Sequence, residues 1–259
     1  MTDTPLTVCG WPDRWLPEQK RKPRIIAEIG LHHGGSVERA SQMMAWASTY
    51  GATDVKFQYF TALDFADRPK GTGWDVLRPY SLGAEHINEL RVYSNCCGLK
   101  FGCSFFGIDG VRTFRKHGGQ LDWAKIPAPY ATRDDVTEAV RGLGVPVVRS
   151  CYHTATFARV VSGDTLMHCT SGYPTPDDEL HLDRIARLPA APELRGWSCH
   201  ATPRNVELTK IALRAQAYGA GVFELHFRDH EVPPDSPDYG VSVWPELLRE
   251  VADALESGK

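Results

Sequence analysis

Two lysines interrupt apolar stretches of this sequence. Lys56 stands inside DVKFQYF, and Lys125 stands inside WAKIPA. A lysine buried among apolar side chains costs several kcal/mol of folding free energy unless it meets an anion or loses its proton. Together with the hydroxyl groups of Ser104 and Ser171, the two ammonium groups would suit a compact anion such as a phosphate or a carboxylate. The lysines therefore predict an anion-binding site.

Histidines and glutamates stand near the ends of other apolar stretches. His200 ends LRGWSCH, and GVFELHF carries both Glu224 and His226. Two neutral imidazoles on adjacent strands could share a divalent ion and leave positions open for water or a substrate oxygen, as a catalytic metal site requires. Each histidine could equally form hydrogen bonds within a polar core, so both interpretations stay open at this point. Glu224 and Glu28, which lies inside RIIAEIG, are candidates for proton transfer.

Apolar stretches of this kind alternate with amphipathic segments along the chain. Eight of them have the length and the flanking turn residues of strands buried on both faces. They are Arg24–Gly30, Asp54–Phe60, Leu99–Phe106, Trp123–Ala128, Val145–Ser150, Thr165–Ser171, Leu194–His200 and Gly221–Phe227. The first helix-like segment begins at the capping residue Ser36 and stops at Gly51. This alternation predicts a (β/α)8 TIM barrel of the α/β class, a single domain at residues 24–259 after an N-terminal extension at residues 1–23.

An open, doubly wound sheet is the competing architecture. It would show a glycine-rich dinucleotide loop after its first strand, but the loop GLHHGGS lacks the G-x-G-x-x-G spacing. One unit of the barrel is irregular, because only about fourteen residues, CYHTATFARVVSGD, separate the fifth and sixth strands. That length is barely enough for a parallel crossover, so a single turn or a stunted helix is expected there.

In a barrel of this kind the carboxyl ends of all strands meet at one rim, where catalytic residues gather. Nearly every predicted strand delivers a polar side chain to that rim. The residues are Glu28, Lys56, Gln58, Ser104, Lys125, Ser150, Thr170, Ser171, Ser198, His200, Glu224 and His226. Stability alone does not account for so many convergent charges, because buried ion pairs often fail to offset their desolvation. The convergence therefore predicts a functional site.

The composition argues against several classes of function. The 259 residues carry a formal net charge of −3 and no apolar run of membrane-spanning length, so neither a nucleic-acid nor a membrane partner is expected. The start, MTDTPLTVCGWPDRW, lacks the charged-then-apolar order of a signal peptide. Seven cysteines without a C-x-x-C pair argue against a disulfide framework or a structural zinc site. A reduced, cytoplasmic protein is the expectation.

Six motifs resemble the catalytic barrel of the sialic acid synthases (N-acetylneuraminate synthases). They are IIAEIGLHHGG, DVKFQYF, AKIPA, HCTSGYPTP, GWSCHAT and FELHF. The family pattern is approximately A-E-I-G-x-N-H-x-G, V-K-F-Q, K-I-x-S, H-C-T-S-x-Y-P-T-P, G-x-S-D-H and E-K-H-F. Order and spacing agree from Arg24 to Leu248, which is nearly the whole chain.

The resemblance implies a metal-dependent synthase that condenses phosphoenolpyruvate with an aldehyde sugar, or another aldehyde, to give a 2-keto acid and phosphate. It implies small-molecule substrates and a divalent ion at His200 and His226, expected to be manganese, with magnesium or cobalt as alternatives. Glu28, Glu224 and Gln58 would act at the reacting centre. The implied substrate-binding residues are Lys56, Ser104, Lys125, Ser171, Tyr173 and Ser198.

Several positions depart from the family pattern. His32 replaces an asparagine, Cys199 an aspartate, Ala128 a serine and Leu225 a lysine. The loss of the serine removes one expected phosphate contact. The family's C-terminal antifreeze-like domain, which supplies an arginine to the sugar site of a partner subunit, is expected to be absent from this chain. A homodimer stays open, as does a separate chain that carries the domain.

These departures predict a remodelled acceptor site. SCYHTAT stands where the family has the turn S-T-G-M-A-T. Its Tyr152 and His153 would remove volume and favour an aldehyde that is smaller than N-acetylmannosamine or has a different shape. Arg149 or Arg228 could substitute for the missing arginine. Water exclusion would come from the loop TALDFADRPKGTGWDVLRPY, with Trp74 as its cover. A surface loop with a packed tryptophan is the equal alternative.

Two other functions stay open. The first is a metal-dependent lyase, aldolase or epimerase that acts on a phosphorylated or carboxylated sugar. Ala128 favours this function, whereas the retention of both Lys56 and Lys125 favours the condensation. The second is a non-catalytic, anion-binding barrel subunit, which would predict decay of the metal site, although both His200 and His226 are present.

Overall fold

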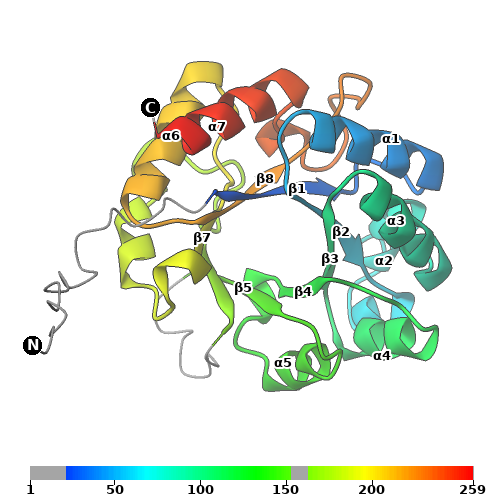
Figure 1. Cartoon of the computed structure of the whole chain (residues 1–259). Helices are drawn as coiled ribbons and strands as arrows, with labels where there is room; N and C mark the ends of the chain where they lie inside the picture. Colours follow the sequence, from blue (N-terminus) through cyan, green and yellow to red (C-terminus); the bar gives the residue numbers. More distant parts are fainter. Residues whose placement is uncertain (1–21, 153–162, 259) are drawn as a thin grey trace, which may run out of the picture.

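The structure, a computed structural model, describes residues 22–152 and 163–258. Within these residues eight parallel strands close into a barrel, and helices cover its outside (Figure 1). Each strand is hydrogen-bonded to the next one along the chain, and the last strand pairs with the first. The strands are β1 (Arg24–Gly30), β2 (Asp54–Tyr59), β3 (Lys100–Phe105), β4 (Trp123–Ile126), β5 (Val147–Cys151), β6 (Thr165–His168), β7 (Arg195–Ser198) and β8 (Val222–His226). The predicted (β/α)8 barrel is confirmed.

In the described part of the chain, six helices coincide with the amphipathic segments of the sequence. They are α1 (Val37–Thr49), α3 (Ala84–Cys96), α4 (Ile108–Lys116), α5 (Asp134–Arg141), α6 (Asn205–Ala217) and α7 (Pro245–Ser257). Helix α1 begins where the sequence predicts, because the Ser36 side chain accepts a hydrogen bond of 3.1 Å from the backbone N–H of Arg39. The loops add the short helix α2 (Trp74–Leu77) and the 3-10 turns η2 (Ala62–Phe65), η3 (Arg78–Tyr80), η4 (Ala128–Tyr130) and η9 (Tyr239–Val241).

The connection between β6 and β7 contains 3-10 turns in place of an α-helix. They are η6 (Asp177–Glu179), η7 (Leu182–Arg187) and η8 (Pro192–Leu194). Pro174, Pro176, Pro189 and Pro192 lack a backbone N–H and interrupt a regular helix at both ends of this connection. Two predictions fall largely outside the described residues: the short turn between the fifth and sixth strands, and the N-terminal extension.

Two layers of side chains fill the barrel from its amino-terminal end upward. The lower layer is an apolar floor, made of the buried side chains of Ile26, Trp123, Val148, Met167 and Val222. Because side chains on a strand point to the same face at every second residue, the position two residues further on each of these strands also points inward. The side chains that stand above the floor are therefore Glu28, Lys125, Ser150, Cys169 and Glu224. The alternation of side chains along each strand thus places a mainly polar layer directly above the apolar floor.

The outward-facing strand residues form the second part of the core. Ile25, Ala27 and Ile29 of β1 alternate with the inward residues and pack, fully buried, in the layer between the strands and the helices. No helix in residues 22–152 and 163–258 has the length and apolar character needed to cross a membrane.

Candidate active site

A cavity of about 110 Å³ opens at the carboxyl ends of the strands. It is lined by the polar layer above the floor and by residues of the loops that follow β3, β4 and β5. The lining residues are Lys56, Gln58, Ser104, Phe106, Lys125, Pro127, Ala128, Pro129, Ser150, Tyr152, Cys169, Ser198, His200, Glu224 and His226. Most of the side chains that the sequence brings to the rim therefore border one space.

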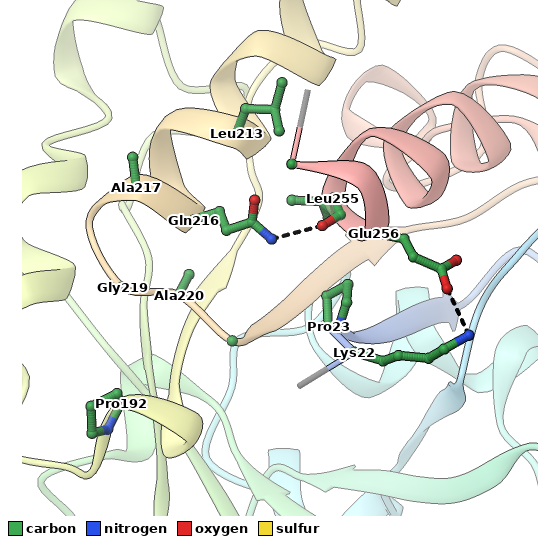
Figure 2. Close-up of a pocket in the computed structure, with 12 residues that line it drawn as sticks. Lys22, Pro23, Pro192, Leu213, Gln216, Ala217, Gly219, Ala220, Leu255 and Glu256 are labelled. Carbon is green, nitrogen blue, oxygen red and sulfur yellow. Dashed lines mark hydrogen bonds and ion pairs between the residues drawn. The ribbon is translucent and has the colours of Figure 1, made fainter. Parts of the chain in front are cut away.

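A larger cavity, of about 700 Å³, lies at the opposite end of the barrel (Figure 2). Its lining comes from residues that precede β1, β7 and β8 and from the last turns of α6 and α7. Its ionisable residues, Lys22 and Glu256, pair with each other at 2.6 Å, and Gln216 donates to the Leu255 carbonyl at 2.8 Å (Figure 2). Because these polar groups are already partnered, volume alone does not identify the active site.

Four charged side chains form the centre of the smaller cavity. Lys56 contacts the carboxylate of Glu28, donates to the Ser104 hydroxyl at 2.7 Å, and lies 3.9 Å from Oε2 of Glu224. Lys125 contacts the other carboxylate oxygen of Glu224. All four charged residues are at most 4% exposed. When all are ionised, the two ammonium and two carboxylate groups balance.

Neutral side chains hold the two carboxylates in place. Gln58 donates through Nε2 to Oε1 of Glu28 at 3.1 Å, and the Ser198 hydroxyl donates to Oε1 of Glu224 at 2.8 Å. Hydrogen bonds to buried charged groups are stronger than those between neutral groups. Each glutamate therefore has a lysine and a neutral donor as partners.

The pKa values of the four groups are shifted in different directions. Burial raises the pKa of Glu28, opposed by Lys56 and helped by the negative charge of Glu224. Burial would also raise the pKa of Glu224, but the ammonium groups of Lys125 and Lys56 outweigh it and lower that pKa. Burial lowers the pKa of Lys125, whereas the carboxylates of Glu224 and Glu28 outweigh the burial of Lys56 and raise its pKa. Two carboxyl groups displaced in opposite directions suit two roles: Glu28 can take up and release a proton, and Glu224 stays ionised.

The two histidines lie beside this cluster with Tyr173 against both rings. The ring centroids of His200 and His226 are 5.9 Å apart, and the Tyr173 ring is edge-on to both. Nδ1 of His200 lies 2.8 Å from the Thr170 carbonyl, which only accepts, so Nδ1 carries the proton and Nε2 keeps its lone pair. Burial lowers the pKa of both histidines, and at His226 the neighbouring His200 lowers it further. Both imidazoles are therefore neutral, as metal binding requires.

Asp238 completes this side of the rim. Its Oδ1 accepts a hydrogen bond of 2.7 Å from the Tyr173 hydroxyl, and its Oδ2 lies 3.7 Å from Nδ1 of His226. The Tyr173 hydroxyl also lies 3.1 Å from Nε2 of His226. Although Tyr173 is 45% exposed, the partial burial of its hydroxyl group and the charge of Asp238 raise its pKa.

These residues fit a divalent ion as a partial set of ligands. Neutral imidazoles bind divalent transition-metal ions, and a carboxylate suits manganese or magnesium. Among the described residues, however, no three histidine, cysteine, aspartate or glutamate side chains group closely enough to hold an ion on their own. An ion at His200 and His226 would therefore take its remaining ligands from water or from a substrate.

Comparison with known proteins identifies the family. The sequence profile of the NeuB family matches residues 43–258. The chain belongs to the NeuB family. It is 27% identical over 248 residues to the uncharacterized protein MJ1065 of Methanocaldococcus jannaschii, which covers 89% of this chain and 69% of that protein. It is 26% identical over 260 residues to an N,N'-diacetyllegionaminic acid synthase of Campylobacter jejuni, which covers 88% of this chain and 74% of the synthase.

Solved structures agree on the fold. An N-acetylneuraminic acid (sialic acid) synthetase from Leptospira borgpetersenii superposes with a TM-score of 0.76 at 23% identity, over 92% of this chain and 84% of that protein. This NeuB-family chain therefore shares its barrel fold with a sialic acid synthetase of known structure, as the resemblance of its motifs predicts.

The structure brings most of the predicted site residues of this NeuB-family chain together. Eight of them line the cavity: Lys56, Gln58, Ser104, Lys125, Ser198, His200, Glu224 and His226. Glu28 lies directly behind the lining, in contact with Lys56 and Gln58, and Tyr173 stands at the rim. Ser171 is placed differently from the prediction, because its side chain is exposed and does not line the cavity. It follows His168, the last residue of β6, by three residues, so the strand no longer directs it inward.

Two arginines considered as replacements for the family arginine do not line the cavity. Arg149 faces outward, where its guanidinium donates to the Ala131 carbonyl at 3.0 Å. Arg228 stacks on the ring of Tyr239, 4.1 Å from its centroid. Ala128 does line the cavity, in an apolar wall with the neighbouring Pro127 and Pro129.

The other residues predicted to reshape or cover the acceptor site are Tyr152, His153 and Trp74. Tyr152 lines the cavity, and His153 lies outside the described residues. Trp74 packs edge-on against Phe60 with ring centroids 6.5 Å apart, and within the described residues no side chain of residues 61–80 lines the cavity. The packed-tryptophan alternative therefore holds for this loop.

Sequence reasoning assigned no role to Asp238, and it missed Cys169 in the cavity lining. The loop residue Asp238 follows no strand periodicity, so only its position before Tyr239 and Gly240 in a turn-like segment could have suggested it. Cys169 continues the inward-facing alternation of β6 and was predictable on that ground.

Proposed function

We propose that this protein is a synthase that condenses phosphoenolpyruvate with an aldehyde in a reaction that depends on a divalent metal. The observation that carries the proposal is the pairing of two buried lysines with two buried glutamates, next to two neutral histidines at one rim. The family membership and the Campylobacter jejuni relative, whose name describes a sugar-acid synthase, support the same chemistry.

The lysines would bind the anionic groups of phosphoenolpyruvate. Lys56 and Lys125 lie in a cluster that is neutral when all four groups are ionised, so an incoming phosphate and carboxylate need added positive charge. Uptake of one proton by Glu28, whose pKa is raised by burial, would leave the cluster with a net positive charge. Ser104, which accepts from Lys56, could turn its own hydroxyl proton toward the substrate.

The reaction joins carbon 3 of phosphoenolpyruvate to the aldehyde carbon and leaves positive character on carbon 2. Water adds there, and the C–O bond to phosphate breaks. Both protons of the water must leave it: one ends on the new hydroxyl group, and the other departs with the phosphate when the 2-keto group forms. Glu28 is suited to carry a proton between these groups, and the ionised Glu224 would stabilise the positive charge on carbon 2. A divalent ion held by His200 and His226 would supply the positive charge that polarises the aldehyde oxygen.

The acceptor would be a compact aldehyde. The cavity of about 110 Å³ corresponds to roughly four water volumes of about 30 Å³ each. Phe106, Tyr152 and Pro127 contribute bulky side chains to its wall. A six-carbon N-acyl sugar would extend beyond this space, so N-acetylmannosamine should react more slowly than a shorter aldehyde.

The test incubates the full chain with phosphoenolpyruvate and a panel of aldehydes that includes N-acetylmannosamine and shorter sugars. Phosphate and 2-keto acid are measured before chelation, after chelation, and after Mn²⁺ is restored. His230→Ala serves as the control for the loss of a histidine, since His230 is exposed and pairs with Glu246. Release of phosphate that requires both an aldehyde and Mn²⁺ is the expected result.

Three other outcomes would overturn the proposal. Conversion of a phosphorylated sugar without phosphoenolpyruvate would assign a lyase or an epimerase. Binding of phosphoenolpyruvate without turnover of any aldehyde would assign an anion-binding subunit. Unchanged turnover after chelation would exclude the metal dependence.

A further inference from the structure

His32 is buried in the loop that follows β1, but its imidazole does not reach the cavity. The side chain is 4% exposed and occupies a position where the family pattern has asparagine. Its two ring nitrogens contact hydroxyl groups of the loop that follows β8, at Ser236 and Ser242. These two serines flank Asp238 in the sequence, so the imidazole spans the base of the segment 236–242, which we call the Asp238 loop.

The hydrogen bonds around His32 assign its tautomer. The Ser242 hydroxyl donates its one proton to the Asp238 carbonyl at 2.7 Å, so it must accept from Nε2 of His32 at 2.8 Å. Nε2 therefore carries the ring proton, and Nδ1 keeps its lone pair, 3.1 Å from the Ser236 hydroxyl, which also lies 3.4 Å from the Pro237 carbonyl. Burial lowers the pKa of His32 to about 4, so this neutral form persists at neutral pH. Every polar atom of the ring has a partner in one loop.

The backbone of His32 is held as well. Its carbonyl accepts from Nε of Arg39 at 3.2 Å, and the same guanidinium donates to Asp229 at 2.7 Å. Asp229 lies at the start of the β8 loop and accepts from the backbone N–H groups of Glu231 and Val232. The imidazole is therefore a rigid support rather than a side chain free to move with its loop.

The Asp238 loop needs such a support. Asp238 has a φ of +67°, in the left-handed region, which aspartate adopts more readily than most residues but less readily than glycine. In this conformation of the loop its carboxylate reaches Tyr173 and His226. The fit is close, because a Cβ atom on Gly30 would lie 3.2 Å from Oδ2 of Asp238 and 3.3 Å from Oε1 of Glu28.

We propose that His32 is a positioning residue that holds the carboxylate of Asp238 against Tyr173 and His226, on the side of the site where the acceptor would bind. The inference rests on the proposed function for its kinetic consequence alone. His32 touches no reacting atom and acts through Asp238. The asparagine of the family pattern, being shorter, could reproduce the contact of Nδ1 but not that of Nε2.

The kinetic test is a double-mutant cycle between His32→Leu and Asp238→Asn. His32→Leu removes both hydrogen bonds at similar volume and should lower kcat/KM for the acceptor about tenfold, as expected for two lost buried hydrogen bonds, without changing KM for phosphoenolpyruvate. His32→Gln, whose amide can reach Ser242, should recover most of this loss. In the Asp238→Asn background His32→Leu should have little further effect. Additive losses would show that His32 does not act through Asp238.

A second measurement is independent of turnover. Hydrogen exchange at the backbone N–H groups of Tyr239, Val241 and Ser242, which are hydrogen-bonded within the Asp238 loop, reports on that loop directly. His32→Leu should accelerate it and His32→Gln should not. His33→Leu is the matched control, since His33 is equally buried but bonds to Gly35 in its own loop. Unchanged exchange in His32→Leu would overturn the inference even if the enzyme is active. Accelerated exchange in a protein without turnover would overturn the proposed function alone.

Discussion

Substitution of Lys56 by methionine tests the central charge cluster most directly. The side chain keeps its approximate length but loses its charge, which leaves Glu28 and Glu224 with Lys125 as the one remaining ammonium group of the cluster. Lys56 is 4% exposed and Glu28 is 0% exposed, so water cannot compensate the carboxylate of Glu28. Removal of one partner of a buried ion pair costs about 3–5 kcal/mol. At about 2–4 °C per kcal/mol for a chain of this size, Tm should fall by roughly 6–20 °C.

Two controls separate the charge effect from the loss of the side chain. The double variant Lys56→Met/Glu28→Gln restores neutrality and keeps an oxygen that can accept from Gln58, so it should recover most of the stability. Lys210→Met removes a lysine whose side chain is 62% exposed and which pairs with Glu207 at 3.0 Å on helix α6. An exposed pair of this kind contributes at most about 1 kcal/mol.

The defect of Lys56→Met should also depend on pH. Loss of Lys56 removes an interaction that lowers the pKa of Glu28, so this already raised pKa rises further. A carboxyl group whose pKa is higher in the folded state loses stability as pH rises from its unfolded value of about 4.3 toward the folded value. The variant should therefore be closer to wild type at pH 5 than at pH 7.5.

The assay is guanidinium chloride unfolding followed by tryptophan fluorescence at both pH values. A free energy of unfolding within about 1 kcal/mol of wild type at pH 7.5 would refute the reasoning, because it would mean that the charge of Glu28 is compensated without Lys56. A larger defect at pH 5 than at pH 7.5 would refute the assignment of the raised pKa.

Three further predictions concern the site. Gly30→Ala and Gly98→Ala both place alanine at a positive φ, so each should lose about 1–2 kcal/mol of stability. Only Gly30→Ala should lower kcat/KM, roughly tenfold, because a Cβ atom at Gly98 would have no atom within 4 Å. Equal kcat/KM in the two variants would contradict this prediction. His200→Ala and His226→Ala should each lose Mn²⁺ binding in calorimetry because their neutral imidazoles are the proposed ligands, and retained binding in the double variant would place the ion elsewhere. Lys125→Met should weaken phosphoenolpyruvate binding about thirtyfold or more, since losing a desolvated charge partner costs at least about 2 kcal/mol; equal affinity in calorimetry would remove Lys125 from the anion site.

Much of the site follows from the sequence by itself. A strand points its side chains to one face at every second residue, so the position of Lys125 two residues after the apolar Trp123 already places it above the floor of a barrel. The eightfold alternation of apolar and amphipathic segments determines the barrel, because parallel strands joined by helices have few other ways to bury both faces. Local periodicity therefore carries both the fold and the inward-facing residues.

Only the tertiary structure decides which of these residues meet. In the closed barrel β1 lies between β8 and β2. Lys56 of β2 therefore contacts Glu28 of the neighbouring strand β1 and also approaches Glu224 of β8. Loops carry no such periodicity. Ser171, three residues beyond β6, is exposed, whereas Asp238 is brought to Tyr173 by a left-handed turn that His32 supports from another loop. These contacts join residues far apart in the chain, and their geometry depends on the packing of whole loops, which a residue pattern along one segment does not contain.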